Sequence, residues 1–383
     1  MRLLGRGLTA SAIIEKYPEV KVYDDTNVDS FDALSDELTV VSPGIPPSHT
    51  LVQKSKNLVS EYDFLLKKEQ FSIWISGTNG KTTTTQMCEL LLSSYGGVAG
   101  GNIGTPLAKL DNKAPIWILE TSSFTLHYTN QAKPNIYLLL PISDDHTSWH
   151  GGFDEYEKTK LKPLDFLDEG EVAIVPKKYE NYPTNGYLIT YENSFELALK
   201  LGIDLEKLHF KEPFKLDALM ALASTKILFD RVDYDLINSF KIDLHKLEEF
   251  YDNQKRLWID DSKATNIDAT IWAIRNFKDK RVFLILGGDD KGADMTLLFE
   301  ELKNYNLKIF AIGSNTDKLV ELSNRYNIEI KPCYNLDIAV KSIDKEHTQK
   351  SIAMLSPAAA SLDQFSSYKH RGLEFKKEVS LLS

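Results

Sequence analysis

The chain alternates short apolar runs with longer segments in which apolar residues recur at helical spacing. Near the start, residues 2–4, 20–24 and 38–42 have the β-type pattern, and residues 9–17 and 49–68 have the helical pattern. Such alternation is typical of parallel α/β units, in which a helix connects each strand to the next. We therefore expect the chain to begin with a small parallel sheet.

Two further series of strands follow. The runs at 71–76, 114–120 and 135–141 are almost continuously apolar, as in strands buried on both faces. The third series comprises 256–260, 281–288, 308–314 and 351–357 and ends in a polar helix from about Ser366. The pattern predicts three α/β domains, spanning residues 1–65, 66–243 and 244–383.

Composition and charge narrow the classes of function. The 383 residues have a formal net charge of -10 and no run of Lys and Arg, which argues against a nucleic-acid partner. The two cysteines, Cys88 and Cys333, lack metal-ligand spacing and do not suggest a disulfide framework. No apolar run approaches the roughly 20 residues of a membrane helix. We expect a cytoplasmic protein without an export signal.

Glycines follow the first strand in a pattern found in nucleotide-binding βαβ units. Gly5, Gly7 and Ala10 lie at the strand-to-helix junction, and Asp24 and Asp25 end the next strand. In such units the helix N-terminus faces phosphate groups. A tight turn without a ligand would produce the same short pattern.

The stretch "FSIWISGTNGKTTTT" carries part of a phosphate-binding loop. Gly80, Lys81 and Thr82 match its end, but Ile75 stands where the common form has glycine, and Gly77 follows two residues later. Lys81 would supply positive charge and the Thr82 hydroxyl would bind magnesium. A merely structural turn is the alternative, although lysine is a poor choice for an unligated turn at a buried strand end.

Polar residues also follow the next two strands. Glu120 ends one of them, and Asp144, Asp145 and His146 come after the other. Because parallel strands present their C-terminal ends at one edge of the sheet, these groups could hold a divalent metal beside Thr82. Taken alone, His146 could be a packed or surface histidine, and Lys160 on the following helix could lie on a solvated face.

A third group of polar residues lies at strand ends of the last domain. It comprises Asp261, Lys263, Thr265, Lys291 and Ser361, the last at an expected helix start. Two lysines with hydroxyls and free N–H groups suit a small dicarboxylate. Each residue alone has an ordinary structural explanation.

Taken together, these motifs resemble the Mur ligase family over the whole chain. The loop "GTNGKTT" is similar to the family's ATP signature, which also lacks the first glycine. "GGNIGTP", "LETSSF", "DDHTSWH", "DSKATN", "GGDDKGAD" and "SPAAASLDQF" resemble further motifs of members that act in peptidoglycan synthesis. The last two are the most discriminating, because they belong to the domain that selects the amino acid, here D-glutamate.

The resemblance implies a fold and a reaction. The fold would have a Rossmann-like N-terminal domain for the UDP-substrate, a central P-loop ATPase domain with a mainly parallel sheet, and a Rossmann-like C-terminal domain for D-glutamate. The reaction would add D-glutamate to UDP-N-acetylmuramoyl-L-alanine through an acyl phosphate, with ATP and two Mg²⁺ ions as cofactors. We expect a monomer without nucleic-acid or membrane partners.

The resemblance also assigns residues to ligands. The residues implied to bind ATP are Gly77, Thr78, Asn79, Gly80, Lys81, Thr82, Thr83, Lys246 and Asp261. Those implied to bind the UDP-substrate are Leu8, Thr9, Ser42, Gly44 and Asn102. Those implied to bind D-glutamate are Lys263, Thr265, Lys291, Ser361, Leu362 and Tyr368. The implied metal ligands are Thr82, Glu120, His146 and Lys160, the lysine as a carbamate. Lys81, Asp145, His146 and Lys160 are the implied catalytic residues.

Two departures from the family pattern concern the nucleotide. Phe214 and Asp217 stand at a helix start where the family has asparagine near the adenine, and His245-Lys246 replaces a His-Arg pair. Lysine offers a point charge where arginine offers a planar, bidentate contact. Another Mur-type or folylpolyglutamate-type ligase, or a P-loop ATPase switch, is the alternative function.

Overall fold

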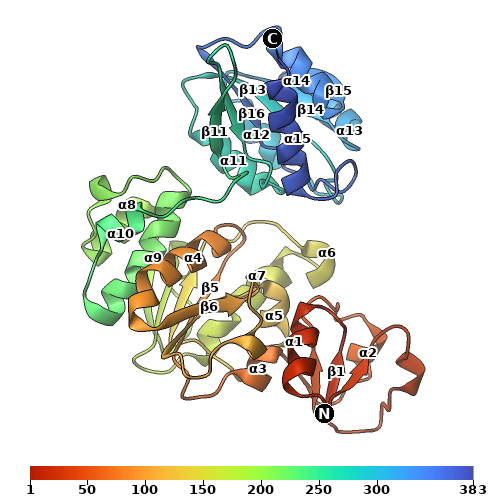
Figure 1. Ribbon diagram of the computed structural model, residues 1–383, viewed down its shortest axis with the longest axis vertical. Coiled ribbons are helices and arrows are strands. Elements are labelled where there is room, and N and C mark those ends of the chain that lie inside the picture. Colours follow the sequence, from red (N-terminus) through yellow and green to blue (C-terminus); the bar gives the residue numbers. More distant parts are fainter. Residues whose placement is uncertain (383) are drawn as a thin grey trace. The chain divides into compact units, whose positions relative to one another are not determined.

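The computed structural model describes residues 1–382; Ser383, at the end of the predicted C-terminal domain, lies outside the described residues. These residues form three sheets within two compact units, Met1–Phe240 and Lys241–Ser383 (Figure 1). The fold is thus mixed α/β with largely parallel sheets. The predicted boundary near residue 244 falls close to the division between the units, whereas the boundary near residue 66 lies inside the first unit.

The first sheet has four parallel strands in the order β2-β1-β3-β4. Its strands are β1 (Arg2–Leu4), β2 (Lys21–Tyr23), β3 (Thr39–Val41) and β4 (Leu58–Val59), and its helices are α1 (Leu8–Lys16), α2 (Thr50–Gln53) and α3 (Glu61–Leu65). Leu3 packs on one face with Ile13 of α1, and Leu4 packs on the other with Leu51 of α2. The sheet is therefore covered on both faces.

The central sheet has six parallel strands in the order β10-β9-β8-β5-β7-β6. They are β5 (Ser72–Ser76), β6 (Gly97–Gly101), β7 (Ile116–Glu120), β8 (Ile136–Leu139), β9 (Val172–Pro176) and β10 (Tyr187–Tyr191). The connection after β5 leads to β6 at one edge of the sheet, and the connections after β8 lead to β9 and β10 at the other edge. The topological switch point therefore lies between the neighbouring strands β5 and β8. Ligands of α/β sheets bind outside the strand C-termini at such a switch point.

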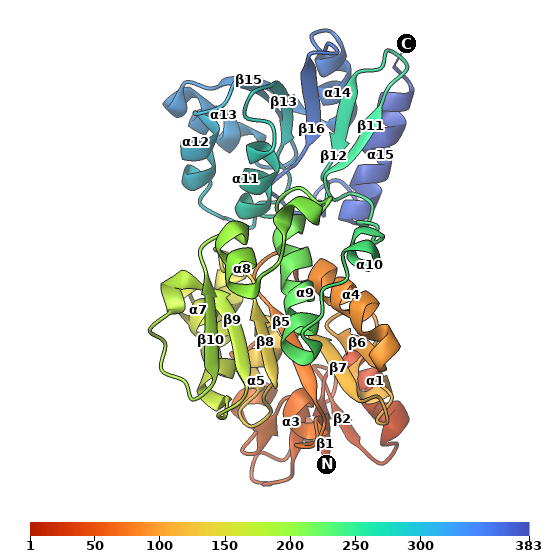
Figure 2. The same cartoon turned by 90° about the vertical axis from the view of Figure 1, so that its left-hand side faces the viewer.

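Helices flank this sheet, and α4 packs beside α9 (Figures 1 and 2). The helices of this part are α4 (Lys81–Leu92), α5 (Ser123–Tyr128), α6 (Thr147–His150), α7 (Phe153–Leu161), α8 (Ser194–Leu201), α9 (Phe214–Phe229) and α10 (Tyr234–Asn238). One hydrophobic core contains Leu3 and Ile13 of the first sheet's layer together with Trp74 and Leu119 of the central sheet. This shared core joins the first two sheets into one unit.

The third sheet has the order β11-β12-β16-β13-β14-β15, with only β11 antiparallel. Its strands are β11 (Glu248–Tyr251), β12 (Leu257–Asp260), β13 (Arg281–Leu286), β14 (Leu307–Ile312), β15 (Glu329–Tyr334) and β16 (Ser351–Leu355). Its helices are α11 (Ile267–Arg275), α12 (Thr296–Leu302), α13 (Thr316–Tyr326), α14 (Leu336–Asp344) and α15 (Tyr368–Ser380).

Alternate residues of β13 face opposite sides of this sheet. Leu284 packs with α11, α12 and α13, whereas Phe283 packs with α14 and α15. Two helical layers therefore enclose the sheet, and the long apolar run predicted at 281–288 is explained by burial on both faces.

Two local predictions were wrong. The helical pattern over 49–68 is divided into α2, β4 and α3, because residues 58 and 59 pair with β3 and Ser60 caps a new helix by accepting from the Asp63 N–H. No helix begins at Ser361, whereas the polar helix expected from about Ser366 is α15, which begins at Tyr368 with Ser367 as its cap. Ser361 instead opens a turn in which its carbonyl accepts the Phe365 N–H at 2.7 Å.

No helix within residues 1–382 is both long enough and apolar enough to cross a membrane.

The first turn of α3 contains a buried acid. Glu61 is 3% exposed, and its Oε2 atom finds no hydrogen-bond partner within the described part of the chain. Burial raises the pKa of Glu61 from 4.5 to about 8. The folded chain therefore keeps a proton that the unfolded chain releases, so its stability falls as the pH rises from 4.5 to about 8.

We predict that Glu61→Gln increases stability at pH 8 and has little effect below pH 5, because glutamine cannot ionise. The difference should grow by about 1.4 kcal/mol per pH unit within that window. Urea unfolding at several pH values measures it, with the exposed residue Glu19 changed to Gln as the control. An unchanged pH dependence in Glu61→Gln would contradict the assignment.

Candidate active site

The phosphate loop spans Gly77–Thr83, between β5 and the first turn of α4. Gly77 and Gly80 have φ angles of 136° and 86°, which side chains other than glycine rarely tolerate. A Cβ atom at Gly77 would lie 2.5 Å from the Leu140 Cβ atom. Both glycines are thus required by the fold, and Gly80, at the cap position of α4, makes no side-chain capping hydrogen bond.

Asp217 of α9 contacts the helix that follows the phosphate loop. It lies in the first turn of α9, is 2% exposed, and its Oδ1 atom accepts a hydrogen bond of 3.1 Å from the Thr84 hydroxyl. A Cβ atom at Gly80 would overlap the same carboxylate oxygen. The residue that departs from the family's asparagine therefore faces the phosphate loop, while Phe214 is the first residue of α9.

Two lysine side chains meet at the Gly77 carbonyl oxygen. Lys81 Nζ lies 3.0 Å from it and 2.7 Å from the Thr78 carbonyl, and Lys160 Nζ lies 2.8 Å from it. Lys160 is 1% exposed, which excludes the solvated-face interpretation. Burial lowers the pKa of Lys160 well below its usual value, and the charge of Lys81 adds to this effect.

Tyr156 connects helix α7 to the loop. Its hydroxyl lies 3.0 Å from the Thr78 hydroxyl, which in turn donates to the Ser143 carbonyl at 3.0 Å. The Lys160 ammonium lies 4.8 Å from the centre of the Tyr156 ring, as expected for residues one turn apart on one helix face. Tyr156 thus orders both the loop and the buried amine.

Glu120 links two predicted ligand groups. Its Oε2 atom accepts from the Thr82 hydroxyl at 2.8 Å and its Oε1 atom from the Asn102 amide at 2.7 Å. A carboxylate and a hydroxyl are hard oxygen donors, the kind that Mg²⁺ prefers. Thr82 and Glu120 therefore fit a magnesium site at the ends of α4 and β7.

His146 follows β8 at the same edge of the sheet. Its φ angle is 54°, its side chain is 41% exposed, and its ring lies edge-on to Phe124 with centroids 4.8 Å apart. The Asp145 carboxylate accepts the His146 backbone N–H at 2.9 Å and lies 3.6 Å from Nε2. The predicted metal ligand is thus oriented by its neighbours and open to solvent.

Four of the five residues predicted to bind the UDP-substrate follow β1 and β3 of the first sheet, with Leu8 and Thr9 at the start of α1, whereas Asn102 follows β6 of the central sheet. A Cβ atom at Gly5, whose φ is 96°, would lie 2.9 Å from Ser42 Oγ, so the loops after β1 and β3 touch. Leu8 is 82% exposed, Ser42 is buried, and Thr9 and Gly44 lie beside them in the chain. Asn102 is the member that contacts Glu120.

In the C-terminal unit, Lys263 and Tyr368 come together from distant parts of the chain. The Lys263 ammonium lies 4.5 Å from the centre of the Tyr368 ring. The loops that carry Lys291 and Ser361 are paired through the backbone of Asp289 and Ala360, at 3.0 and 2.9 Å. Leu362 is 69% exposed beside buried Ser361, and Thr265 follows Lys263 by two residues.

Arg371 of α15 ties these loops together, and sequence reasoning missed it. It is 1% exposed and donates to the Ser262 hydroxyl and carbonyl and to the carbonyls of Ala359 and Ala360, at 2.9–3.3 Å. A positive charge lies under the predicted dicarboxylate site. Its only sequence signal was an arginine on the buried face of the last helix.

Asp261 and Lys246, both predicted for ATP, have partners within the C-terminal unit. The Asp261 carboxylate accepts from the Leu247 N–H at 3.1 Å and the Ser356 hydroxyl at 2.7 Å. Burial raises the pKa of Asp261 to about 7. Lys246 Nζ lies 2.9 Å from Asp243 Oδ2. Asp261 thus supports the backbone beside Lys246.

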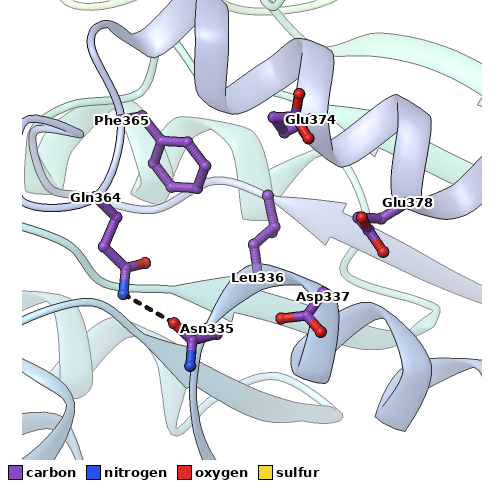
Figure 3. Close-up of a pocket in the computed structure, with 7 residues that line it drawn as sticks. All are labelled: Asn335, Leu336, Asp337, Gln364, Phe365, Glu374 and Glu378. Atoms are coloured by element: carbon purple, nitrogen blue, oxygen red, sulfur yellow. Dashed lines mark hydrogen bonds between the residues drawn. The ribbon is translucent and has the colours of Figure 1, made fainter.

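A pocket of about 410 Å³ in the C-terminal unit contains none of the predicted residues (Figure 3). Leu336 and Phe365 contribute apolar surface, and Gln364 donates to Asn335 at 3.4 Å. Asp337, Glu374 and Glu378 give the wall negative charge. This charge would repel a dicarboxylate, so the pocket does not compete with the loops around Lys263.

Comparisons with known proteins identify a family and close relatives of this chain. The family described as "Mur ligase middle domain" matches residues 75–211. A UDP-N-acetylmuramoylalanine–D-glutamate ligase of Campylobacter jejuni is 50% identical over 99% of this chain and 98% of its own length. A Helicobacter pylori protein of the same name is 44% identical over 98% of both chains.

Solved structures show the same fold at low sequence identity. The MurF ligase of Thermotoga maritima in complex with ADP has a TM-score of 0.61 at 14% identity, covering 98% of this chain and 94% of that one. MurC of the same organism has a TM-score of 0.57 at 13% identity, covering 98% of both chains.

The contact between Gly80 and Asp217 generates a prediction. Gly80→Ala should weaken ATP binding at least 10-fold, because the new methyl group displaces the loop from the Asp217 carboxylate. Isothermal titration with a non-hydrolysable ATP analogue measures this. Gly202→Ala is the control, since Gly202 has a φ of 65° and open space around a Cβ position. Equal affinities of the two variants would contradict the role of this contact.

Proposed function

This chain belongs to the Mur ligase family of UDP-N-acetylmuramoylalanine–D-glutamate ligases, and we propose that it joins D-glutamate to UDP-N-acetylmuramoyl-L-alanine with hydrolysis of ATP. The near full-length match to a named ligase carries the proposal. The phosphate loop and the cationic loops of the C-terminal unit supply chemistry for ATP and for a dicarboxylate. The pathway is peptidoglycan precursor synthesis.

The first half of the proposed reaction activates a carboxylate. A carboxylate repels amines and has no good leaving group, so its oxygen first attacks the γ-phosphorus of ATP, releasing ADP and forming an acyl phosphate. Lys81 and the N–H groups of residues 77–83 stabilise the charge that spreads over the transferring phosphoryl group. The bound UDP-substrate is held by Leu8, Thr9, Ser42, Gly44 and Asn102 in this proposal.

The second half forms the amide. The amine of D-glutamate attacks the acyl carbon, the tetrahedral intermediate expels phosphate, and Asp145 orients the amine or accepts its proton. The two carboxylates of D-glutamate pair with Lys263 and Lys291, and Thr265, Ser361, Leu362 and Tyr368 complete the proposed contacts. Lys246 and Asp261 are proposed to serve ATP.

Thr82, Glu120, His146 and carbamylated Lys160 are the residues proposed to hold two Mg²⁺ ions. When bound, the ions would neutralise phosphate charge. The short contact between Thr82 and Glu120 supports this choice of ligands.

Phosphate release tests the function. Purified protein should release phosphate only when ATP, UDP-N-acetylmuramoyl-L-alanine and D-glutamate are all present. Replacing D-glutamate with L-glutamate, L-alanine or meso-diaminopimelate should remove the activity. Equal release without any amino acid would indicate a simple ATPase, and preference for another amino acid would indicate a different ligase.

Lys291→Ala should raise the KM for D-glutamate about 10- to 100-fold, the cost of losing a hydrogen bond to a charged group. The KM for ATP should change little. Lys280→Ala, at the opposite end of β13, is the matched control for a lost exposed lysine. Parallel increases in both KM values would instead indicate a structural role for Lys291.

Lys160 is proposed to carry a carbamate, formed when its neutral amine adds to carbon dioxide and loses a proton. Its buried amine beside the Lys81 ammonium supports this, since an anionic product would relieve the clustering of positive charge. The alternative is an unmodified lysine that pairs with a phosphate.

We predict that Lys160→Ala loses activity and that millimolar acetate partly restores it, because a short carboxylate can occupy the vacated position. Steady-state phosphate release with and without acetate measures the effect. Lys158→Ala, two residues away with a side chain 76% exposed, is the control. Loss without rescue, or full activity without acetate, would contradict the carbamate.

A further inference from the structure

A buried histidine–carboxylate pair lies where the C-terminal unit begins. His245 Nδ1 and Asp260 Oδ2 are 2.6 Å apart, and the two residues are 3% and 0% exposed. Hydrogen bonds with a charged partner in such a dry environment are among the strongest in proteins. The pair joins the segment before β11 to the last residue of β12.

The pair also holds the loop that carries Lys263. The other carboxylate oxygen of Asp260 accepts the Ser262 N–H at 3.1 Å, and the His245 carbonyl accepts the Lys263 N–H at 3.0 Å. The backbone that leads into Lys263 is thereby held by both members of the buried pair.

The backbone at this point is strained and therefore needs such support. His245 and Leu247 have φ angles of 65° and 48°, a conformation that costs residues other than glycine about 1–2 kcal/mol. Glu248 Oε2 accepts the His245 N–H at 3.0 Å, and Asp261 accepts the Leu247 N–H. The strained turn persists because acidic side chains satisfy its N–H groups.

Helix α15 closes the pair from the other side. Lys376 Nζ lies 2.5 Å from Glu248 Oε1 and 3.9 Å from Asp260 Oδ2. Ligand atoms of His245, Glu248 and Asp260 lie within 4.8 Å of one another, a spacing that could suit a metal ion. The Lys376 ammonium already supplies the compensating positive charge, so the cluster is better explained as an ion-pair network.

The same helix carries Tyr368, whose backbone carbonyl accepts the Ser262 hydroxyl at 2.8 Å. We propose that the His245–Asp260 pair is a positioning group that sets Lys263 against Tyr368 and so shapes the D-glutamate site. This inference rests on the proposed function. It assigns roles to His245 and Asp260, neither of which is expected to touch the amino acid.

Gly372 offers a test that removes no polar group. A Cβ atom at Gly372 would lie 2.2 Å from His245 Nδ1 and 2.8 Å from Asp260 Oδ2, too close for either contact. Within a helix, alanine is favoured over glycine by about 1 kcal/mol, so Gly372→Ala supports α15 while displacing the pair. The neighbouring residue Leu373, 57% exposed, provides the control Leu373→Ala.

We expect Gly372→Ala to raise the KM for D-glutamate at least 10-fold, with kcat and the KM for the UDP-substrate within about twofold of the wild type. The thermal upshift that D-glutamate produces in the full chain should shrink in the same variant. Leu373→Ala should behave like the wild type. An unchanged D-glutamate KM in Gly372→Ala, with an active wild type, overturns the inference alone.

Asp260→Asn provides an independent arm if Gly372→Ala folds poorly. The amide keeps the oxygen that accepts from Ser262 but loses the charge that faces His245 and Lys376. We expect a raised D-glutamate KM here too, and Asp260→Ala should be worse than Asp260→Asn. If the variants have a lower melting temperature and a lower kcat but an unchanged KM for D-glutamate, the His245–Asp260 pair has a structural role only. A wild type without D-glutamate dependence would instead refute the proposed function, and this inference with it.

Discussion

The Gly77 carbonyl oxygen accepts hydrogen bonds from two lysines, and the organisation of the ATP site depends on this convergence. Lys81 and Lys160 approach it from different helices, at 3.0 and 2.8 Å. Two buried ammonium groups would repel one another, which is why burial and the Lys81 charge hold the pKa of the Lys160 amine well below its usual value. The free energy of such a site falls when it binds an anion, either a phosphate group or a carbamate. The unfavourable clustering of charge is thus what prepares the loop for its ligands.

The same arrangement recurs in the C-terminal unit with a different cation. Arg371 donates to the carbonyl groups of Ser262, Ala359 and Ala360, and so joins two loops while placing a charge beneath them. Desolvation lowers the pKa of Arg371 to about 10, which leaves it charged at neutral pH. In both units, backbone carbonyls hold a buried cation and leave N–H groups and exposed side chains for an anionic ligand.

Much of the candidate ATP site could be predicted from sequence because its residues lie at the ends of apolar strands. Glu120 and His146 were predicted beside Thr82 since parallel strands present their C-termini at one edge. For Lys160 the local pattern allowed a solvated face, because "DEYEKTKL" shows no signal of the long-range contact with Gly77, and only the family resemblance implied a role in the site. Arg371 and Asp217 were missed as supports for the same reason: the groups they bind, among them the Ser262 backbone and the Thr84 hydroxyl, lie far away in the chain.

Two of the strands that the sequence analysis missed, β6 and β15, contain no long apolar run. Strand β6 reads "GVAGG" and lies at a sheet edge, and β15 reads "EIKPCY" at the edge of the third sheet. Edge strands tolerate glycine, proline and polar residues because one side of the ladder is not buried. Pattern alone could not separate them from loops.

The central claim is that the phosphate loop transfers the γ-phosphoryl group to a carboxylate, which an amine then attacks. Oxygen transfer tests this directly. UDP-N-acetylmuramoyl-L-alanine labelled with ¹⁸O in both carboxylate oxygens is turned over with ATP and D-glutamate, and the phosphate is examined by mass spectrometry. An acyl phosphate predicts one ¹⁸O atom in each phosphate released and one in the amide. Unlabelled phosphate, or label in AMP, would contradict the account.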